Sequence, residues 1–217
     1  MTNHRSGMLH EFSRFCFSLS ALLLMYSLSM FALPASAHEF WVEPGNFRSP
    51  AGAPLNVRVL VGQDFRGDGV VFLPETFERF VTITARGKQN INGIPGDDPA
   101  ARLTPAEPGL MFVVYQSTRY SLTLDAETFD TYLKKEGLEG IRTLRGKSDK
   151  PANEVYSRYA KSLLAIGGQN SGLDSKKPLG LRLEIVPLSP IYQRARGQEV
   201  EVQLLYENKP LVGAQIE

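Results

Sequence analysis

The sequence predicts a mainly β protein with two helices, and three observations lead to this fold class. Apolar and polar residues alternate over several short segments, most clearly over 55–62, with the period of two that half-buried strands show. Gly and Pro residues separate these segments, as expected of turns and loops. Helical spacing of apolar residues is found over 126–136 and 152–166. We therefore expect strands for most of the chain and a helical insertion in its second half.

The first 37 residues have the pattern of a cleavable signal peptide. A polar, weakly basic start precedes the uncharged apolar run 16–33. Small residues at Ala35 and Ala37 form a cleavage site, so that the mature chain begins at His38. The alternative is an uncleaved membrane anchor, because the apolar run is just long enough to span a bilayer. We favour cleavage, and expect a periplasmic or secreted protein that touches the membrane only through the signal peptide before cleavage.

Composition excludes several classes of function. Lysine plus arginine nearly equals aspartate plus glutamate, 24 against 23, whereas a nucleic-acid-binding protein shows a basic excess. The expected mature chain has no cysteine and one histidine, so it has no disulfide and no Ser/His/Asp or Cys/His catalytic set. Phosphate-loop and dinucleotide-binding fingerprints are absent. We therefore expect no nucleic-acid partner and a protein that is not an enzyme.

The first part of the mature chain is expected to form strands. They are predicted at 38–42, 55–62, 78–86, 110–116 and 120–124. An irregular segment between the third and fourth of them, 87–109, is rich in Gly, Pro and Asp. Binding residues are often displayed by such loops on a rigid scaffold.

Two helices are expected next. Asp125 is a suitable N-cap for a helix over 126–136, and Gly137 is a natural stop. The basic segment 142–150 is expected to be a loop. Pro151 would then occupy the first turn of a second helix over 152–166.

Tyr156 and Arg158, within this second predicted helix, are candidates for lining a binding groove. The alternative is that the helix packs on a sheet, because five residues form an apolar stripe at helical spacing: Val155, Tyr156, Tyr159, Leu163 and Ile166. Glu154 is also expected to pair with Arg158 at i,i+4 spacing.

The end of the chain is expected to form a second, partial β-module. A Gly/Ser/Lys/Pro linker over 168–180 precedes strands predicted at 181–186, 199–206 and 211–216. The predicted organisation is a signal peptide over 1–37, a β-rich domain with a helical insertion over 38–180, and a partial module over 181–217. Because a lone hairpin is marginal in water, we expect this module to be incomplete here or to pack onto the first domain.

A histidine at the mature N-terminus, His38, is the feature that points to a metal. Its α-amine loses a proton near neutrality, and its imidazole supplies a second nitrogen. Such ligands suit nickel, cobalt, copper or zinc. Without a second histidine, carboxylates would complete the site, and Glu39, Asp64 and Asp97 are the leading candidates, with Glu43, Asp68 and Asp98 as further ones. The alternative is that His38 merely follows the cleavage site and points to solvent.

Trp41 and Asp98 are further candidates for a binding surface. A tryptophan can serve as an aromatic platform, although it more often packs in a core. Asp98 lies with Asp97 at the centre of the irregular loop, and such a pair more often forms a turn than a ligand set.

Several longer motifs resemble the DUF4198 family of exported bacterial proteins. They lie at 38–44, 61–65, 95–100, 107–110, 129–138, 154–163, 183–187 and 197–214. The resemblance covers 38–217 and implies an immunoglobulin-like β-sandwich followed by an immunoglobulin- or transthyretin-like module, which continues further in relatives. It also implies a periplasmic component of cobalt or nickel transport, and it brings no catalytic residues.

Two functional hypotheses follow from the residues and the resemblance. The first is a periplasmic, non-enzymatic protein that binds or hands on a transition-metal ion of the nickel, cobalt or copper type. Its partner would be a metal uptake transporter or an outer-membrane receptor. The second is an exported β-sandwich module that binds a protein or glycan partner at the cell envelope. A hydrolase acting on envelope material is the weakest alternative.

Overall fold

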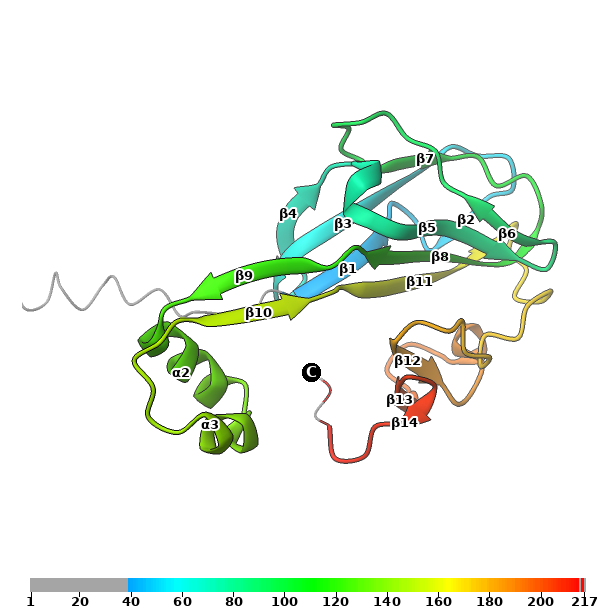
Figure 1. Cartoon of the computed structure of the whole chain (residues 1–217). Coiled ribbons are helices and arrows are strands. Elements are labelled where there is room, and N and C mark those ends of the chain that lie inside the picture. Colours follow the sequence, from blue (N-terminus) through cyan, green and yellow to red (C-terminus); the bar gives the residue numbers. More distant parts are fainter. Residues whose placement is uncertain (1–38, 215, 217) are drawn as a thin grey trace, which may run out of the picture. The chain divides into compact units, whose positions relative to one another are not determined.

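The computed structural model describes residues 39–214 and residue 216 of the chain (Figure 1). The chain divides between Ala37 and His38, and all described residues belong to the second unit. The predicted signal peptide, its cleavage site at Ala35 and Ala37, and the predicted metal ligand His38 lie outside the described residues. Within the part that the structure describes, no helix is both long and apolar enough to span a bilayer.

The described chain is mainly β with two α-helices, which confirms the predicted fold class. The strands are β1 (Glu39–Pro44), β2 (Arg48–Ser49), β3 (Leu55–Gln63), β4 (Arg66–Val70), β5 (Phe77–Thr84), β6 (Gly87–Asn90), β7 (Ala101–Leu103), β8 (Gly109–Ser117), β9 (Tyr120–Leu124), β10 (Ala152–Tyr156), β11 (Tyr159–Ile166), β12 (Leu183–Pro187), β13 (Val202–Tyr206) and β14 (Lys209–Pro210). The helices are α2 (Ala126–Lys135) and α3 (Glu139–Arg145), with short 3-10 turns η2 (Pro74–Thr76) and η3 (Ile191–Gln193).

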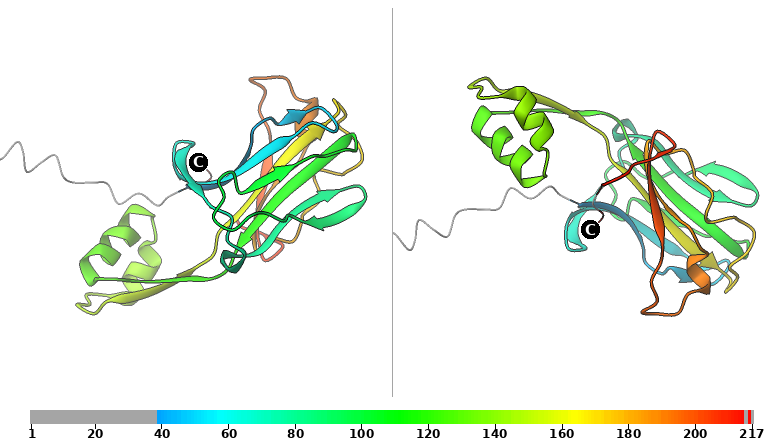
Figure 2. Two further views of the ribbon diagram at one scale, coloured as in Figure 1. Left: turned by 90° about the horizontal axis from the view of Figure 1, so that it is seen from above. Right: turned by 90° about the horizontal axis from the view of Figure 1, so that it is seen from below.

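Two sheets pack face to face as a sandwich (Figures 1 and 2). One sheet has the order β1-β3-β4, with β7 also paired to β3, and the other has the order β2-β11-β8-β5-β6. Strand β3 shows why its sequence alternates: Leu55, Val57 and Val59 are buried between the sheets, while Asn56 is exposed. Burying each such side chain contributes about 1.5–3 kcal/mol to stability.

Strand β8 is buried on both faces, which explains its unbroken apolar sequence. Met111, Val113 and Tyr115 face the core between the two sheets. Phe112 and Val114 face a second, smaller core on the outer side, which the segment leading to β12 covers through residues such as Leu181.

The second predicted helix is wrong: residues 152–166 form β10 and β11 instead. Strand β11 pairs with β8 over eight positions, from Tyr159–Gln116 to Ile166–Gly109, and β10 pairs with β9. An apolar run buried on both faces has the same composition as a buried helix, so periodicity alone did not separate the two. Accordingly Glu154 and Arg158 are not neighbours on a helix face.

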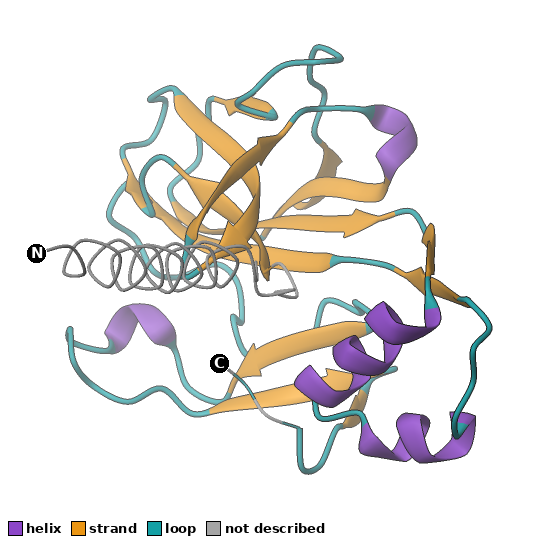
Figure 3. Ribbon diagram, turned by 90° about the vertical axis from the view of Figure 1, so that its left-hand side faces the viewer, coloured by secondary structure: helices purple, strands orange, loops and turns teal. Residues whose placement is uncertain are grey.

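In the chain, β9 follows β8 and β11 follows β10, so that the pair β9–β10 continues from the pair β8–β11. The two helices come between β9 and β10 (Figure 3). Helix α2 begins as predicted, because the Asp125 carboxylate accepts hydrogen bonds from Thr128 N (2.8 Å) and Thr128 Oγ1 (2.7 Å). Helix α3 was not predicted. Its second half, from Arg142 to Arg145, lies in the segment 142–150 that was expected to be a loop. The described residues therefore form two α-helices, but the second is a different segment from the one predicted.

The C-terminal sheet has the order β12-β13-β14. Glu207 and Asn208 both have positive φ, 51° and 62°, and form a two-residue turn that places Lys209 opposite Tyr206. The predicted strand over 211–216 is therefore wrong, because the partner strand starts directly after the turn and β14 ends at Pro210.

Candidate binding groove

An apolar groove lies between the sandwich and the C-terminal sheet. Its volume is about 710 Å³, and residues of β1, β11, β12 and β13 line it, together with Phe47, Phe65, Phe112, Leu181 and Ile191. The ion pair of Lys161 in β11 and Glu184 in β12 connects the two sides. We call this space the groove.

One wall of the groove is an apolar face of the C-terminal sheet. In β12, Leu183 and Ile185 are 41% and 44% exposed, whereas the intervening Glu184 is only 3% exposed. The register pairs Ile185 with Leu204 and Pro187 with Val202, so these side chains share the face. This inverts the usual alternation, because the apolar residues face the open space and the carboxylate is buried.

The opposite wall carries an aromatic pair from β1 and the turn after β3. The Trp41 and Phe65 rings meet edge to face, with centroids 5.8 Å apart. Phe65 is 78% exposed, and its φ of 56° follows a φ of 52° at Asp64 in the two-residue turn. The Glu39 carboxylate accepts hydrogen bonds from the N–H groups of both turn residues, at 3.2 and 3.5 Å. Trp41 thus lies in a groove wall and is only half-buried.

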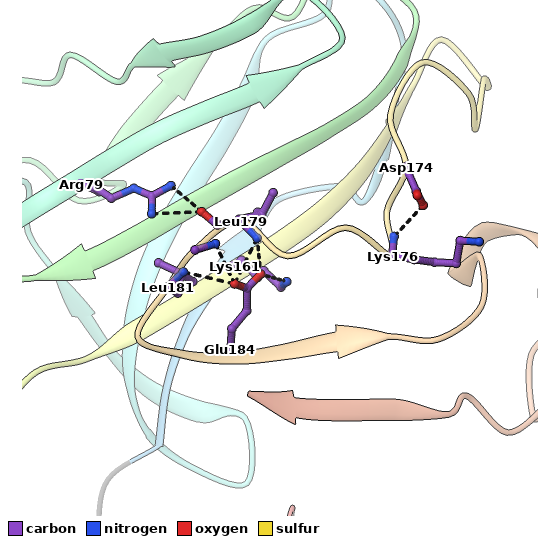
Figure 4. Close-up of polar contacts among 8 residues, drawn as sticks. Arg79, Lys161, Asp174, Lys176, Leu179, Leu181 and Glu184 are labelled. Atoms are coloured by element: carbon purple, nitrogen blue, oxygen red, sulfur yellow. Dashed lines mark hydrogen bonds and ion pairs between the residues drawn. The ribbon is translucent and has the colours of Figure 1, made fainter. Parts of the chain in front are cut away.

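A buried carboxylate holds the C-terminal sheet against the sandwich (Figure 4). Glu184 accepts a hydrogen bond from Lys161 Nζ of β11 at 2.6 Å. It also accepts hydrogen bonds from the backbone N–H groups of Leu179, Gly180 and Leu181, at 2.8–3.1 Å. The four donors satisfy the carboxylate, as the burial of a charge requires.

A second contact lies at the other end of β12. The Tyr192 hydroxyl is 2.7 Å from the Leu163 carbonyl oxygen and 2.8 Å from that of Phe47, and donates its one proton to either. The Arg48 guanidinium lies over the Tyr192 ring, 4.6 Å from its centroid. Burial raises the pKa of the Tyr192 phenol, so it stays protonated and remains a donor at neutral pH.

Most polar side chains that line the groove, the Tyr159 hydroxyl excepted, already have partners inside the protein. Trp41 Nε1 donates to Glu43 Oε2 at 3.2 Å, and Ser162 Oγ donates to the Val42 carbonyl oxygen. Lys161 and Glu184 bond to each other. The surface left for a ligand is therefore mainly apolar.

The structure brings two of the predicted metal ligands together and separates others. The Glu39 carboxylate accepts a hydrogen bond from Asp64 N, and Glu39 directly follows His38 in the chain. Asp97 forms an ion pair with Arg102 at 2.6 Å. Between residues 39 and 216, where placed, no group of three or more His, Cys, Asp and Glu side chains has a geometry suited to a metal ion.

Asp98, a predicted binding residue, forms a two-pronged ion pair with Arg58 at 2.9 and 3.1 Å. The hydrogen bonds from this guanidinium lower the pKa of the Asp98 carboxyl. The loop of which Asp97 and Asp98 form the centre is therefore held to β3 and β7 by two arginines.

Tyr156 and Arg158, the remaining predicted binding residues, lie where the β9–β10 pair meets the sandwich. The Tyr156 ring stacks on Tyr120, its cross-strand neighbour, at 5.4 Å between centroids. Arg158 lies over the rings of Tyr156 and Phe40. The structure thus brings this pair together, although on strands and not on the expected helix.

Sequence patterns did not identify Phe65, Glu184 or Tyr192. The two-residue turn at Asp64 and Phe65 lacks the usual Asn-Gly or Asp-Gly signal, so no strong sequence signal could have located Phe65. No sequence signal marks Glu184 as buried, because alternation with Leu183 and Ile185 places the charge on the solvent side.

The fold and the groove together define the class: a mainly β sandwich protein with an attached three-stranded sheet and an apolar groove between them. The chain belongs to the family described as Domain of unknown function (DUF4198), which matches residues 35–217. The family resemblance of the motifs is thereby confirmed. No curated protein and no solved structure matches the chain significantly.

Proposed function

We propose that this protein is an exported, non-enzymatic binding module of the cell envelope, and that its groove binds an apolar segment of a partner protein. The observation that carries the proposal is the groove of about 710 Å³, most of whose polar side chains are already bonded inside the protein. Ligand sites are concave and mostly apolar, and uncovered apolar faces of this kind mark interaction sites.

A protein partner accounts for the groove better than a glycan does. A sugar needs several free hydrogen-bonding groups that orient its hydroxyls, and most polar groups of the groove are already satisfied. Leu183, Ile185 and Leu204 instead offer an apolar strip, and Trp41 and Phe65 offer an aromatic wall. Export is supported by the signal-peptide pattern over 1–37, and it places the partner in the periplasm or at the outer membrane.

The test uses the fluorescence of Trp41, the single tryptophan of the chain. The purified protein is titrated with an alternating apolar peptide, acetyl-Leu-Thr-Leu-Thr-Leu-amide, and separately with maltohexaose. We expect the peptide to shift the Trp41 emission to the blue and the sugar to leave it unchanged. An emission change with the sugar alone would contradict the proposal.

Variants connect the signal to the groove. Ile185→Asp places a charge on the apolar wall and should weaken peptide binding about tenfold or more, since burying an unpaired charge is unfavourable. Leu144→Asp is the matched control, because Leu144 is also exposed and lies on α3, outside the groove. Equal loss in both variants would show that the peptide binds elsewhere.

A transition-metal role is the second candidate function, favoured by the contact between Glu39 and the turn at Asp64. Glu39 follows His38 in the chain, and the α-amine and imidazole of His38 would supply nitrogen ligands for nickel, cobalt or copper. Such a protein would hand the ion to an uptake transporter or an outer-membrane receptor.

Calorimetric titration of the chain that begins at His38 with each ion tests this candidate. His38→Ala and an added N-terminal methionine should both abolish one-to-one binding, and Asp64→Asn should weaken it. Asp97→Asn is the control, because Asp97 is held by Arg102 and should matter little. Binding that is indifferent to both N-terminal changes would exclude a site at His38.

A further inference from the structure

The junction between β10 and β11 fixes the main chain of Arg158 from both sides. Ser117 N donates to the Arg158 carbonyl oxygen at 2.9 Å, and Arg158 N donates to Ser117 Oγ at 2.8 Å. Ser117 is itself buried at the end of β8. The backbone from which this arginine side chain extends is therefore anchored to the sandwich.

Two aromatic rings hold the Arg158 side chain. Its guanidinium carbon lies 5.4 Å from the ring centroid of Phe40 and 5.4 Å from that of Tyr156. Tyr156 stacks in turn on Tyr120, and Phe40 packs against Tyr115 at 5.2 Å between centroids. Contacts of this kind with ring faces restrict the guanidinium plane and leave its N–H edge unused.

The Arg158 guanidinium forms no hydrogen bond or ion pair with any residue that the structure places. Five other arginines of the described chain form ion pairs: Arg58 with Asp98, Arg86 with Glu107, Arg102 with Asp97, Arg142 with Asp130 and Arg182 with Glu207. Arg158 is also half-buried, so its charge is partly removed from water without a carboxylate to balance it.

We propose that Arg158 is a carboxylate-binding site, adjacent to the groove. A guanidinium fork offers two parallel N–H donors that match the two oxygens of a carboxylate, and an orientation restricted in advance lowers the entropy lost on binding. The neighbouring Tyr156 and Phe40 rings provide apolar contact for the carbon atoms beside the carboxylate. The ligand is a small carboxylic acid or an acidic side chain of a polypeptide, which share this chemistry.

The site borders the proposed peptide groove. Arg158 is not part of the groove lining, but Phe40, one of the two rings beside its guanidinium, is. Arg158 variants therefore test the carboxylate site, whereas Ile185→Asp tests the groove.

The experiment follows the Arg158 Nε–Hε resonance of the purified protein by NMR during titration with acetyl-glutamate-amide. Acetyl-glutamine-amide, which is neutral and of the same shape, is titrated beside it, and inorganic phosphate is the third probe. We expect the glutamate derivative to move the Arg158 resonance in a saturable way at millimolar concentration, and the glutamine derivative to leave it unmoved. Equal responses to both derivatives, or tighter binding of phosphate, would overturn the proposal.

Three variants complete the test. Arg158→Gln should lower the affinity for acetyl-glutamate-amide at least about tenfold, and Arg158→Lys should lower it about fivefold, because an ammonium keeps the charge without the fork. Arg119→Gln is the control, an exposed arginine near the same junction, and should change the affinity less than about twofold. Unchanged affinity in Arg158→Gln would refute the site. If that variant does not fold, the affinity of Arg158→Lys and the response of the Arg158 resonance in the unchanged protein decide whether the site exists.

Discussion

The sandwich and the C-terminal sheet of this protein are held in place by different forces. In the sandwich, β8 is buried on both faces and its neighbours supply two apolar cores. In the C-terminal sheet, the apolar residues Leu183 and Ile185 stay largely exposed, while a carboxylate, Glu184, is buried at the contact with β11. The first region is stabilised mainly by apolar burial, whereas the second combines the burial of Val186 and Leu205 with a few polar contacts.

The difference shows how a small sheet can keep an apolar surface available for binding. If Leu183 and Ile185 packed on the sandwich, burial would stabilise the fold but would leave no groove. Because Glu184 and Tyr192 make the attachment instead, the apolar face remains open to a ligand. Four predictions test this comparison.

The largest effect is expected when a buried leucine of the sandwich is truncated, in comparison with a leucine of the C-terminal sheet. Leu164 is fully buried in the sandwich, whereas Leu204 lies half-buried in the groove wall. We expect Leu164→Ala to lower the free energy of unfolding by about 3 kcal/mol and Leu204→Ala by less than about 1 kcal/mol. Urea denaturation of both variants measures this. Comparable losses would mean that the C-terminal sheet is part of the cooperative core.

The buried ion pair should give the next largest effect. Glu184→Ala leaves Lys161 and three backbone N–H groups without their acceptor, which we expect to cost about 3 kcal/mol. The loss should be local, so hydrogen exchange of residues 179–187 should accelerate more than that of β8. Glu207→Gln, at the exposed pair with Arg182, is the control and should leave exchange unchanged. If residues 179–187 of Glu184→Ala stay protected from hydrogen exchange, apolar contacts attach the sheet.

Removal of the Tyr192 hydroxyl should have a smaller effect. Tyr192→Phe loses the donor to the Leu163 and Phe47 carbonyl oxygens but keeps the ring under Arg48. We expect a loss of about 1 kcal/mol in unfolding free energy, with the structure retained. Thermal unfolding monitored by circular dichroism measures it, and no change would indicate that water replaces the hydroxyl there.

The smallest effect is expected at the exposed ion pair of Arg58 and Asp98, whose side chains are 43% and 33% exposed. The hydrogen bonds from Arg58 lower the pKa of Asp98 below the ordinary value of 3.8. Its contribution, about 0.5 kcal/mol, is therefore present above that value and is lost as the pH falls through the folded-state pKa. Asp98→Asn should match the unchanged protein in strong acid and be slightly less stable near neutrality. A stability difference between Asp98→Asn and the unchanged protein that grows as the pH falls would contradict this expectation.

Sequence patterns predicted the strands of the sandwich well where one face meets solvent. Alternation over 55–62 matches β3, and Asp125 begins α2 as expected. The pattern was misleading over 152–166, because β11 is buried on both faces and resembles a helix in composition. It was also misleading at 211–216, where the turn at Glu207 and Asn208 places the partner strand two residues earlier.

The candidate site was predicted only in fragments. Trp41, Tyr156 and Arg158 were named as candidate binding residues from their chemistry, but their neighbours Phe65 and Phe40 come from other segments of the chain. Asp97 and Asp98 were candidates as ligands, and the structure shows each bonded to an arginine, one of them 40 residues away in sequence. Side-chain pairing over such distances leaves no trace in a local pattern.

The sequence by itself determined the fold class, the family and the positions of most strands, because periodicity and motifs are local properties of the chain. Only the tertiary structure decided that residues 152–166 are strands, that Glu184 is buried and that Leu183 and Ile185 face an open groove. The physical reason is that burial depends on which distant segment covers a residue. In β12 the donors around 179–181 and Lys161 stabilise a buried charge, and this reverses the usual arrangement of apolar and polar side chains.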